Sequence, residues 1–289
     1  MILSGDAVVK KIRDDIDQRL SIVKDKDIKP VLGLVMVGRT EENDAYYKII
    51  QKQCDEHGIV IKLFDFDNDI RQVKLIDCME SLNRDDNIQG VKMFTPLPPH
   101  INDYEVRNVL VPSKDLEGMT DRSMAATVSG QYVGYPPCMA EATLIMLKHY
   151  DIPIAGKNIV VMGKHLAACQ PISMLLTANR GTVTLTNDET KREDLRRYCE
   201  NADIVVAATG VHRSFGADLA FPRQTVIDVG IDYEEESIGS NVAFDAVKDK
   251  VANITPVPGG ISDVMTAVLL DHMAQAVETD LKNRPGYNL

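Results

Sequence analysis

Apolar residues recur along the chain in two alternating patterns, which predict helices and strands in turn from the first residues onward. Over residues 5–25 they stand three or four positions apart, as on a helix with one buried face. The segment 29–38 is largely apolar after Lys29 and predicts a buried strand. A helix from about Asp44 to His57, a strand over 59–67, a helix over 71–85 and a strand from 88 into a proline-rich loop follow. This alternation predicts a parallel sheet with helices on both faces.

The second half of the chain repeats the alternation after a passage over 119–141 that we expect to be mostly loop. A helix is predicted over 142–150, then strand, loop, helix and strand over 156–188, with further short strands in 202–210 and 224–232. Such a series is typical of a dinucleotide-binding domain. Residues 262–283 predict a long amphipathic helix, whose apolar stripe comprises Met265, Val268, Leu269, Met273 and Val277.

Composition and charge narrow the class of protein. The 289 residues carry a formal net charge of −11, which argues against nucleic acid as a partner because phosphate binding favours a basic surface. The sequence has no apolar run of about 18 residues, and its N-terminus becomes charged early, so we expect no membrane contact and a cytoplasmic location. The five cysteines lack metal-ligand spacing, which predicts reduced, mostly buried thiols and no metal site.

Six short motifs appear in a characteristic order: TPLPP, KDLEG, YPPC, ADIVVAATG, VIDVGI and ITPVPGG. From about residue 2 to about 280, their order and spacing resemble the methylenetetrahydrofolate dehydrogenase/cyclohydrolase family. The resemblance implies an α/β fold with an N-terminal catalytic-type domain over 1–140 and a Rossmann-like dinucleotide-binding domain over 141–263. It further implies a folate site in a cleft between the domains, a C-terminal helix of about 264–289 that packs back on the first domain, and a homodimer.

The hydrolytic half of the family's chemistry depends on a lysine four residues after a tyrosine and on a glutamine before the PLP turn. Tyr46 matches the tyrosine, but Ile50 stands at the lysine position and Phe94 at the glutamine position. Lys48 and Lys52 flank position 50, yet two residues along a helix turn a side chain about 200° away. The sequence therefore predicts that the cyclohydrolase step is lost.

The resemblance makes Tyr46 and Glu117 the catalytic candidates. Glu117 stands where the family has an aspartate that holds the pterin, so its carboxylate is set back by one methylene group. The loop GGISDVMT is one residue longer than its family counterpart and lacks that counterpart's second glycine and its proline. The substrate contacts that the resemblance implies, besides Tyr46 and Glu117, are Asn43, Phe94, Pro96, Leu97, Pro258, Gly259 and Gly260.

The expected nucleotide loop is GKHLAACQP, residues 163–171, in which Cys169 replaces a family glycine. A pyrophosphate needs glycines that let it approach backbone N–H groups, and a Cβ at Cys169 could obstruct that approach. Asp188, 25 residues after Gly163, could accept a ribose hydroxyl and would repel a 2′-phosphate, which favours NAD over NADP; alternatively, Asp188 or Asn187 caps the next helix. The implied cofactor contacts are Gly163, Lys164, His165, Asp188, Thr209, Gly210 and Ile231.

Four interpretations are compatible with the sequence. An NAD-preferring methylenetetrahydrofolate dehydrogenase without cyclohydrolase activity is favoured, because Tyr46 and Asp188 fit it. A catalytically silent homologue, or pseudoenzyme, that binds a folate, a nucleotide or a partner subunit would explain the many departures from the family. A bifunctional enzyme with a rearranged base is the third. A cleft retuned for another one-carbon or pterin-like substrate is the fourth.

Overall fold

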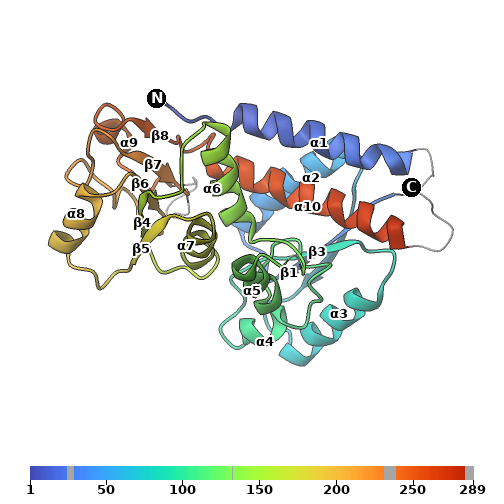
Figure 1. The fold of residues 1–289 in the computed structure, drawn as a ribbon. Helices are drawn as coiled ribbons and strands as arrows, with labels where there is room; N and C mark the ends of the chain where they lie inside the picture. Colours follow the sequence, from blue (N-terminus) through green and yellow to red (C-terminus); the bar gives the residue numbers. More distant parts are fainter. Residues whose placement is uncertain (25–28, 132, 231–238, 284–289) are drawn as a thin grey trace. The chain divides into compact units, whose positions relative to one another are not determined.

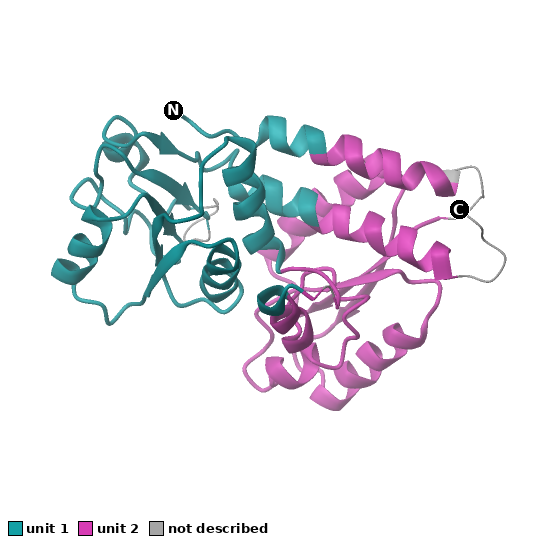
Figure 2. Cartoon of the chain, viewed as in Figure 1, with its two compact units in different colours: residues 1–11, 127–130, 137–268 teal, residues 12–126, 131–136, 269–289 magenta. Residues whose placement is uncertain are grey.

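The computed structural model describes residues 1–24, 29–131, 133–230 and 239–283 (Figure 1). The chain divides into two compact units, which Figure 2 colours separately. The three-stranded unit comprises residues 12–126, 131–136 and 269–289, and the five-stranded unit comprises residues 1–11, 127–130 and 137–268. Each unit is built around its own parallel sheet.

The sheet of the three-stranded unit has the order β2-β1-β3, with β1 Val31–Val37, β2 Val60–Phe66 and β3 Gly90–Met93. All pairings are parallel, as predicted from the alternation of strands and helices. Because β2 and β3 flank β1 on opposite sides, the chain changes direction across the sheet between β1 and β3. In open α/β sheets such a switch point opens a crevice at the carboxyl ends of the strands.

Helices cover both faces of this sheet (Figure 1). They are α1 Asp6–Lys24, α2 Glu41–His57, α3 Gln72–Arg84, α4 Asp103–Arg107, α5 Asp121–Ser129 and α10 Ile261–Asn283. Val91 and Met93 of β3 pack with Leu75, Met79 and Leu82 of α3 in one core cluster. The C-terminal helix α10 contacts α1, since Arg19 pairs with Asp271 at 3.3 Å and with Glu278 at 2.9 Å.

Three boundaries in this unit differ from the sequence prediction. Helix α2 begins at Glu41 rather than near Asp44, because the Thr40 hydroxyl accepts the N–H of Asn43 at 3.1 Å and caps the first turn. The passage expected to be loop contains α5, and the short helix α4 precedes it. Neither α4 nor α5 has a strong apolar period, since each buries only one residue, Val106 and Ser123 respectively.

The sheet of the five-stranded unit has the order β5-β4-β6-β7-β8 and is parallel throughout. Its strands are β4 Asn158–Met162, β5 Thr182–Thr186, β6 Ile204–Ala207, β7 Thr225–Asp228 and β8 Asn253–Ile254. Its helices are α6 Cys138–His149, α7 Cys169–Ala178, α8 Arg192–Glu200 and α9 Phe244–Val247. The predicted Rossmann-like arrangement is confirmed, with a switch point between β4 and β6.

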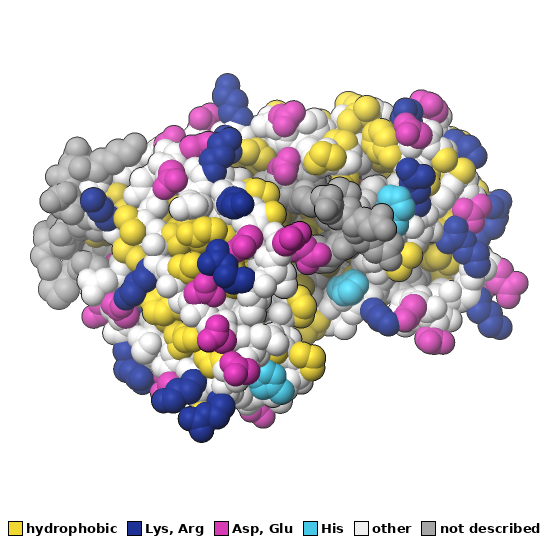
Figure 3. All heavy atoms as spheres, turned by 180° about the vertical axis from the view of Figure 1, so that it is seen from behind, with side chains coloured by type: hydrophobic (Ala, Val, Ile, Leu, Met, Phe, Trp, Pro, Cys, Tyr) yellow, Lys and Arg dark blue, Asp and Glu magenta, His cyan; other side chains and the backbone are white. Residues whose placement is uncertain are grey.

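The cysteines and the surface agree with the composition. Four cysteines are buried, Cys78 is half-buried and all five are free thiols. Figure 3 shows acidic and basic side chains interspersed on the face it presents. Among the described residues, no helix combines the length and the apolar character needed to cross a bilayer.

Candidate active site

Four side chains of the three-stranded unit come together at the predicted folate site: Tyr46, Lys92, Phe94 and Glu117. The Tyr46 and Phe94 rings meet edge to face, with centroids 6.0 Å apart. The Lys92 ammonium lies 5.3 Å from the Tyr46 centroid and 5.4 Å from the Phe94 centroid. It also donates a hydrogen bond of 2.5 Å to Glu117 Oε1. The site therefore combines a cation, a carboxylate and two aromatic faces.

Strand geometry explains why Lys92 and Phe94 reach the same place. Side chains alternate along a strand, so Val91 and Met93 enter the core beside α3 while Lys92 and Phe94 project from the opposite face. Lys92 lies opposite Leu34 of β1, and the Phe94 N–H donates to the Val35 carbonyl at 2.8 Å, which extends the pairing past β3. Both side chains leave the sheet at the carboxyl end of β3, beside its switch point.

The loop that carries Glu117 is held in place by buried polar contacts. Asp115, only 3% exposed, accepts the N–H groups of Met119 at 3.1 Å and Thr120 at 2.7 Å. On the far side, His272 Nδ1 of α10 lies 2.7 Å from the Leu116 carbonyl, and the Tyr135 ring stacks on the His272 ring at 4.8 Å. These contacts fix the backbone on both sides of Glu117 and so determine where its carboxylate can reach.

The other residues predicted for this site occupy varied environments. Ile50 is 0% exposed and Phe94 is 4% exposed, so both pack in the interior. Lys48 and Lys52 are exposed on α2, and Asn43 lies in the first turn of that helix. Pro96, which follows a cis peptide bond, is exposed, whereas Leu97 is half-buried against the core cluster of β3 and α3.

Sequence reasoning missed Lys92. The lysines that the sequence offers as replacements, Lys48 and Lys52, both lie on α2, where the family's lysine stands. A signal was nevertheless present, since a lysine interrupts the apolar segment GVKMF two positions before Phe94. In a strand, that spacing places both side chains on one face.

The remaining predicted substrate contacts, Pro258, Gly259 and Gly260, belong to the five-stranded unit. Their loop is tied to the start of α1, because the Gly5 N–H donates to the Gly259 carbonyl at 2.7 Å. A Cβ at Gly260 would lie 2.3 Å from the Pro256 carbonyl oxygen, so the turn has no room for a side chain there. Gly260 is therefore required by the loop's own packing, whereas Gly259 is favoured by its φ of +92°.

The predicted nucleotide residues of the five-stranded unit follow the carboxyl ends of three adjacent strands. Gly163 follows β4, Asp188 lies just beyond β5, and Thr209 with Gly210 comes after β6. The loops of β4 and β6 touch, since the Ala208 N–H donates to the Met162 carbonyl at 2.9 Å. This is the edge at which doubly wound sheets bind dinucleotides.

Gly163 and Cys169 pack against each other and against Ala208 at the start of the expected nucleotide loop. Gly163 has a φ of +132°, and a Cβ there would lie 2.2 Å from the Ala208 carbonyl oxygen. The Cys169 side chain is fully buried and its thiol donates to the same Ala208 carbonyl at 3.3 Å. Burial raises the pKa of the Cys169 thiol. The sulfur lies in the interior against the Gly163 turn, where a Cβ on Gly163 would come within 2.8 Å of it, and burial favours the neutral thiol.

Lys164 and Asp188, two predicted cofactor residues, pair with each other. Their hydrogen bond raises the pKa of Lys164 and lowers that of Asp188. Both side chains are more than half exposed, which leaves the pair open to competition from a ligand. The alternative prediction that Asp188 or Asn187 caps the next helix is wrong, because α8 has Lys191 at its N-cap and no side-chain cap bond. His165 is exposed, and its carbonyl accepts the Cys169 N–H at 2.9 Å.

A buried pair, Asp228 and Asn241, holds the loop after β6 and was also missed by sequence reasoning. Asn241 Oδ1 accepts from the Gly210 N–H at 2.8 Å and from the Thr209 hydroxyl at 3.0 Å. Its amide donates to Asp228 Oδ1 at 3.2 Å. Asp228 ends an apolar strand at the sheet's carboxyl edge, which is a usable signal; Asn241 sits in a loop that carries none. Ile231, the last predicted cofactor contact, lies outside the described residues.

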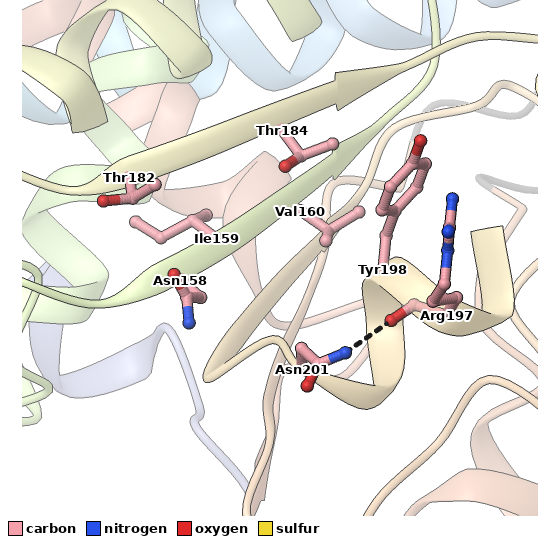
Figure 4. A pocket seen from close by; sticks show the side chains of 8 residues that line it. All are labelled: Asn158, Ile159, Val160, Thr182, Thr184, Arg197, Tyr198 and Asn201. Carbon is pink, nitrogen blue, oxygen red and sulfur yellow. Dashed lines mark hydrogen bonds between the residues drawn. The ribbon is translucent and has the colours of Figure 1, made fainter. Parts of the chain in front are cut away.

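A cavity elsewhere in this unit is unsuited to the predicted ligand (Figure 4). It has a volume of about 330 Å³ and is lined by Asn158, Ile159, Val160, Thr182, Thr184, Arg197, Tyr198 and Asn201. Asn158 and Thr182 are the first residues of β4 and β5, at the end of the sheet opposite Gly163 and Asp188. Among the described residues, no cluster of three or more His, Cys, Asp or Glu side chains could hold a metal ion.

Comparisons with known proteins match two successive stretches of the chain to two domain models of one family. Residues 3–117 match the family model of the tetrahydrofolate dehydrogenase/cyclohydrolase catalytic domain, and residues 137–281 match that of its NAD(P)-binding domain. The chain is 35% identical over 279 residues to the bifunctional protein FolD of Carboxydothermus hydrogenoformans, which covers 96% of both proteins.

Solved structures give the same result. The bifunctional enzyme FolD from Campylobacter jejuni, a methylenetetrahydrofolate dehydrogenase/cyclohydrolase, superimposes with a TM-score of 0.91 at 29% identity, over 96% of this chain and 99% of that one. A 5,10-methylenetetrahydrofolate dehydrogenase from the silkworm Bombyx mori superimposes with a TM-score of 0.90 at 27% identity, over 98% and 99% of the two chains.

Proposed function

Because this chain belongs to the tetrahydrofolate dehydrogenase/cyclohydrolase family, we propose that it transfers a hydride from 5,10-methylenetetrahydrofolate to a nicotinamide dinucleotide. The observation that carries the proposal is the position of Gly163, Asp188 and Gly210, which follow three adjacent strands at the switch point of the five-stranded sheet. Loops at this edge of a doubly wound sheet can present backbone N–H groups to a dinucleotide, which supports the proposal.

In this reaction the protein's task is chiefly to hold the reacting groups. The nicotinamide, when bound, supplies the hydride acceptor. Glu117 offers a carboxylate for the pterin ring, and Tyr46 offers an aromatic face half-exposed on α2. Gly163, Lys164, Thr209 and Gly210 are the residues that would hold the dinucleotide. Correct orientation of two bound reactants can supply much of a rate enhancement without further chemistry from the protein.

A second candidate function is binding without catalysis, as a silent homologue. The observation that favours it is the ion pair between Lys92 and Glu117, because a carboxylate already engaged by an ammonium is less available to a pterin. The predicted loss of the cyclohydrolase step stays a prediction, and it considers only a lysine supplied by α2. A homodimer also stays a prediction.

The test is an initial-rate assay of methenyltetrahydrofolate formation from methylenetetrahydrofolate, with NAD and NADP in parallel. We expect turnover with at least one dinucleotide, and calorimetric binding of each ligand alone. Folate or nucleotide binding without any turnover would support the silent homologue instead. If neither ligand binds, the cleft serves a different molecule and the proposal fails.

Within this proposal NAD is the preferred cofactor, and the bond between Asp188 and Lys164 sets the preference. Asp188 would hold the ribose hydroxyls of NAD while preventing Lys164 from binding a 2′-phosphate. Asp188→Ser releases the ammonium, so we expect the ratio of kcat/KM for NADP to that for NAD to rise by about tenfold. Steady-state kinetics with both cofactors measures the ratio.

Glu189→Ser is the matched control for this prediction. It removes the same charge one residue away, but Glu189 has only a longer-range electrostatic effect on Lys164. We expect less than about a twofold change in the ratio, since exposed charges are screened by solvent and salt. Equal shifts in the two variants would mean that net charge, and not the bond to Lys164, governs the preference.

A further inference from the structure

Lys92 occupies a position that sheet packing alone does not explain. It is 4% exposed and lies in a strand whose other residues, Gly90, Val91 and Met93, are small or apolar. Moving an ammonium out of water carries a large desolvation cost, which an aliphatic residue of similar size would avoid. The contacts of the Lys92 ammonium must therefore offset this desolvation cost, or the lysine must serve a function that an aliphatic residue could not.

Another lysine of the same unit illustrates the structural alternative. The Lys114 ammonium donates to the Leu82 carbonyl at 2.7 Å and to the Asp85 carbonyl at 2.8 Å, where it satisfies the C-terminal end of α3. Its contacts are those of a helix cap. The Lys92 ammonium instead lies against Tyr46, Phe94 and Glu117, three residues assigned independently to the folate site.

The position of Lys92 compensates for the residue that α2 lacks. Ile50 is fully buried, so α2 presents no amine one turn beyond Tyr46. Strand β3 instead supplies an amine, the Lys92 Nζ, 5.3 Å from the centre of the Tyr46 ring. The tyrosine, the amine and the carboxylate are thus present together, although the amine belongs to a different element.

The chemistry that needs such an amine is addition of water to the methenyl cation that hydride transfer produces. Water attacks the methenyl carbon: a C–O bond forms, the C–N π pair moves onto nitrogen, and one water proton passes to a base. The bond from that carbon to one of its two nitrogens then breaks, the nitrogen keeps the electron pair and takes the proton back, and the second water proton leaves as the formyl C=O forms. One water is consumed and one proton is released.

We propose that Lys92 is the general acid/base residue of this hydrolysis, supplied by β3 in place of the lysine absent from position 50. The inference rests on the proposed function, because it requires a folate at this site. The neutral amine accepts the first water proton and returns it to the leaving nitrogen. Glu117, 2.5 Å from the Lys92 Nζ, stabilises the ammonium between the two transfers.

The experiment supplies methenyltetrahydrofolate directly and follows its hydrolysis by the full chain, above the rate in buffer alone. We expect the natural chain to accelerate hydrolysis. Lys92→Met and Lys92→Arg should each lower kcat for hydrolysis by about 100-fold or more, the usual contribution of a general acid/base group. Arginine keeps the charge and the contact with Glu117 but cannot release a proton at neutral pH.

Lys62→Met is the matched control. Lys62 is also a strand lysine of this unit with an acidic partner, Asp85, at 3.4 Å. Its side chain is 53% exposed, and none of its described contacts is with a residue assigned to the folate site. We expect hydrolysis at the natural rate. If Lys92→Met fails to fold, Lys92→Arg still tests the proposal, with circular dichroism and calorimetric folate binding as checks that it is intact.

Three outcomes overturn the inference. Absence of hydrolysis in the natural chain would mean that the step is lost, as Ile50 and Phe94 predict. Full hydrolysis by Lys92→Arg would reduce Lys92 to a fixed positive charge that positions Glu117. Unchanged hydrolysis by Lys92→Met would remove its role altogether. Hydride transfer is measured separately, so a chain that hydrolyses methenyltetrahydrofolate but reduces no dinucleotide would refute the proposed function and leave Lys92 in its role.

Discussion

Replacing Gly163 with alanine is expected to lower dinucleotide affinity by about 100-fold or more, equal to about 2.7 kcal/mol of binding free energy. The backbone φ of +132° disfavours a side chain, at a cost of about 1–3 kcal/mol. The new Cβ would also lie 2.2 Å from the Ala208 carbonyl oxygen. That oxygen belongs to backbone paired with β4, so the Gly163 loop has to move instead. Calorimetry with NAD and chemical denaturation measure the two effects.

Gly156→Ala is the control that separates strain from collision. Gly156 has a φ of +73° in the same unit, yet a Cβ there would meet nothing within 4 Å. We expect it to lower the free energy of unfolding by about 1 kcal/mol and to leave dinucleotide affinity unchanged. Normal NAD binding by Gly163→Ala would show that the turn is not part of a nucleotide site.

The second large effect is expected from Glu117→Gln, which should weaken folate binding by about 10- to 100-fold. Loss of a charge-assisted hydrogen bond to a ligand costs about 1.5–3 kcal/mol. The same change deprives Lys92 of its carboxylate partner and should lower the free energy of unfolding by about 2 kcal/mol. This is less than for a fully buried pair, because 28% of the Glu117 side chain is exposed. Folate calorimetry and urea denaturation measure the two quantities.

Glu56→Gln provides the comparison for Glu117→Gln. Glu56 lies on α2 and pairs with Arg13 at 3.4 Å, but both side chains are 39% exposed. Such a pair contributes less than about 1 kcal/mol, and folate binding should not change. If Glu117→Gln binds folate as well as the natural chain does, another group anchors the pterin and the ion pair with Lys92 is structural.

The fold could be predicted from the sequence because the strands are short, apolar and separated by helices with clear periods. The parallel pairing of β1 with β2 and β3, and of β4 with β5 and β6, follows from that alternation. The helices α4 and α5 escaped notice because five or nine residues with one buried side chain give almost no periodic signal. Helix α2 began early because its Thr40 cap precedes the first apolar residue.

The sequence predicts those features of the candidate site that depend on a single helix, strand or loop, and misses those that depend on contacts between elements. The sequence shows that position 50 supplies no amine and places Gly163 in a loop after a predicted strand; the structure buries Ile50 and gives Gly163 a positive φ. The lysine motif of the family lies within one helix, so it does not point to Lys92, whose amine reaches Tyr46 from β3. Asn241 depends on a contact with Gly210 across 31 positions of the chain, and no local pattern encodes that.

Because the bond between Lys164 and Asp188 is exposed, we expect the proposed preference for NAD over NADP to depend on ionic strength. In the protein without a bound cofactor, Asp188 binds the Lys164 ammonium, which a 2′-phosphate would otherwise bind. Dissolved ions weaken attractions between exposed charges, and at about 0.15 M salt the screening length is about 8 Å. Concentrated salt therefore weakens both the internal bond and the attraction to a phosphate. The proposed preference for NAD should therefore be sharpest in dilute buffer and should narrow as the ionic strength rises.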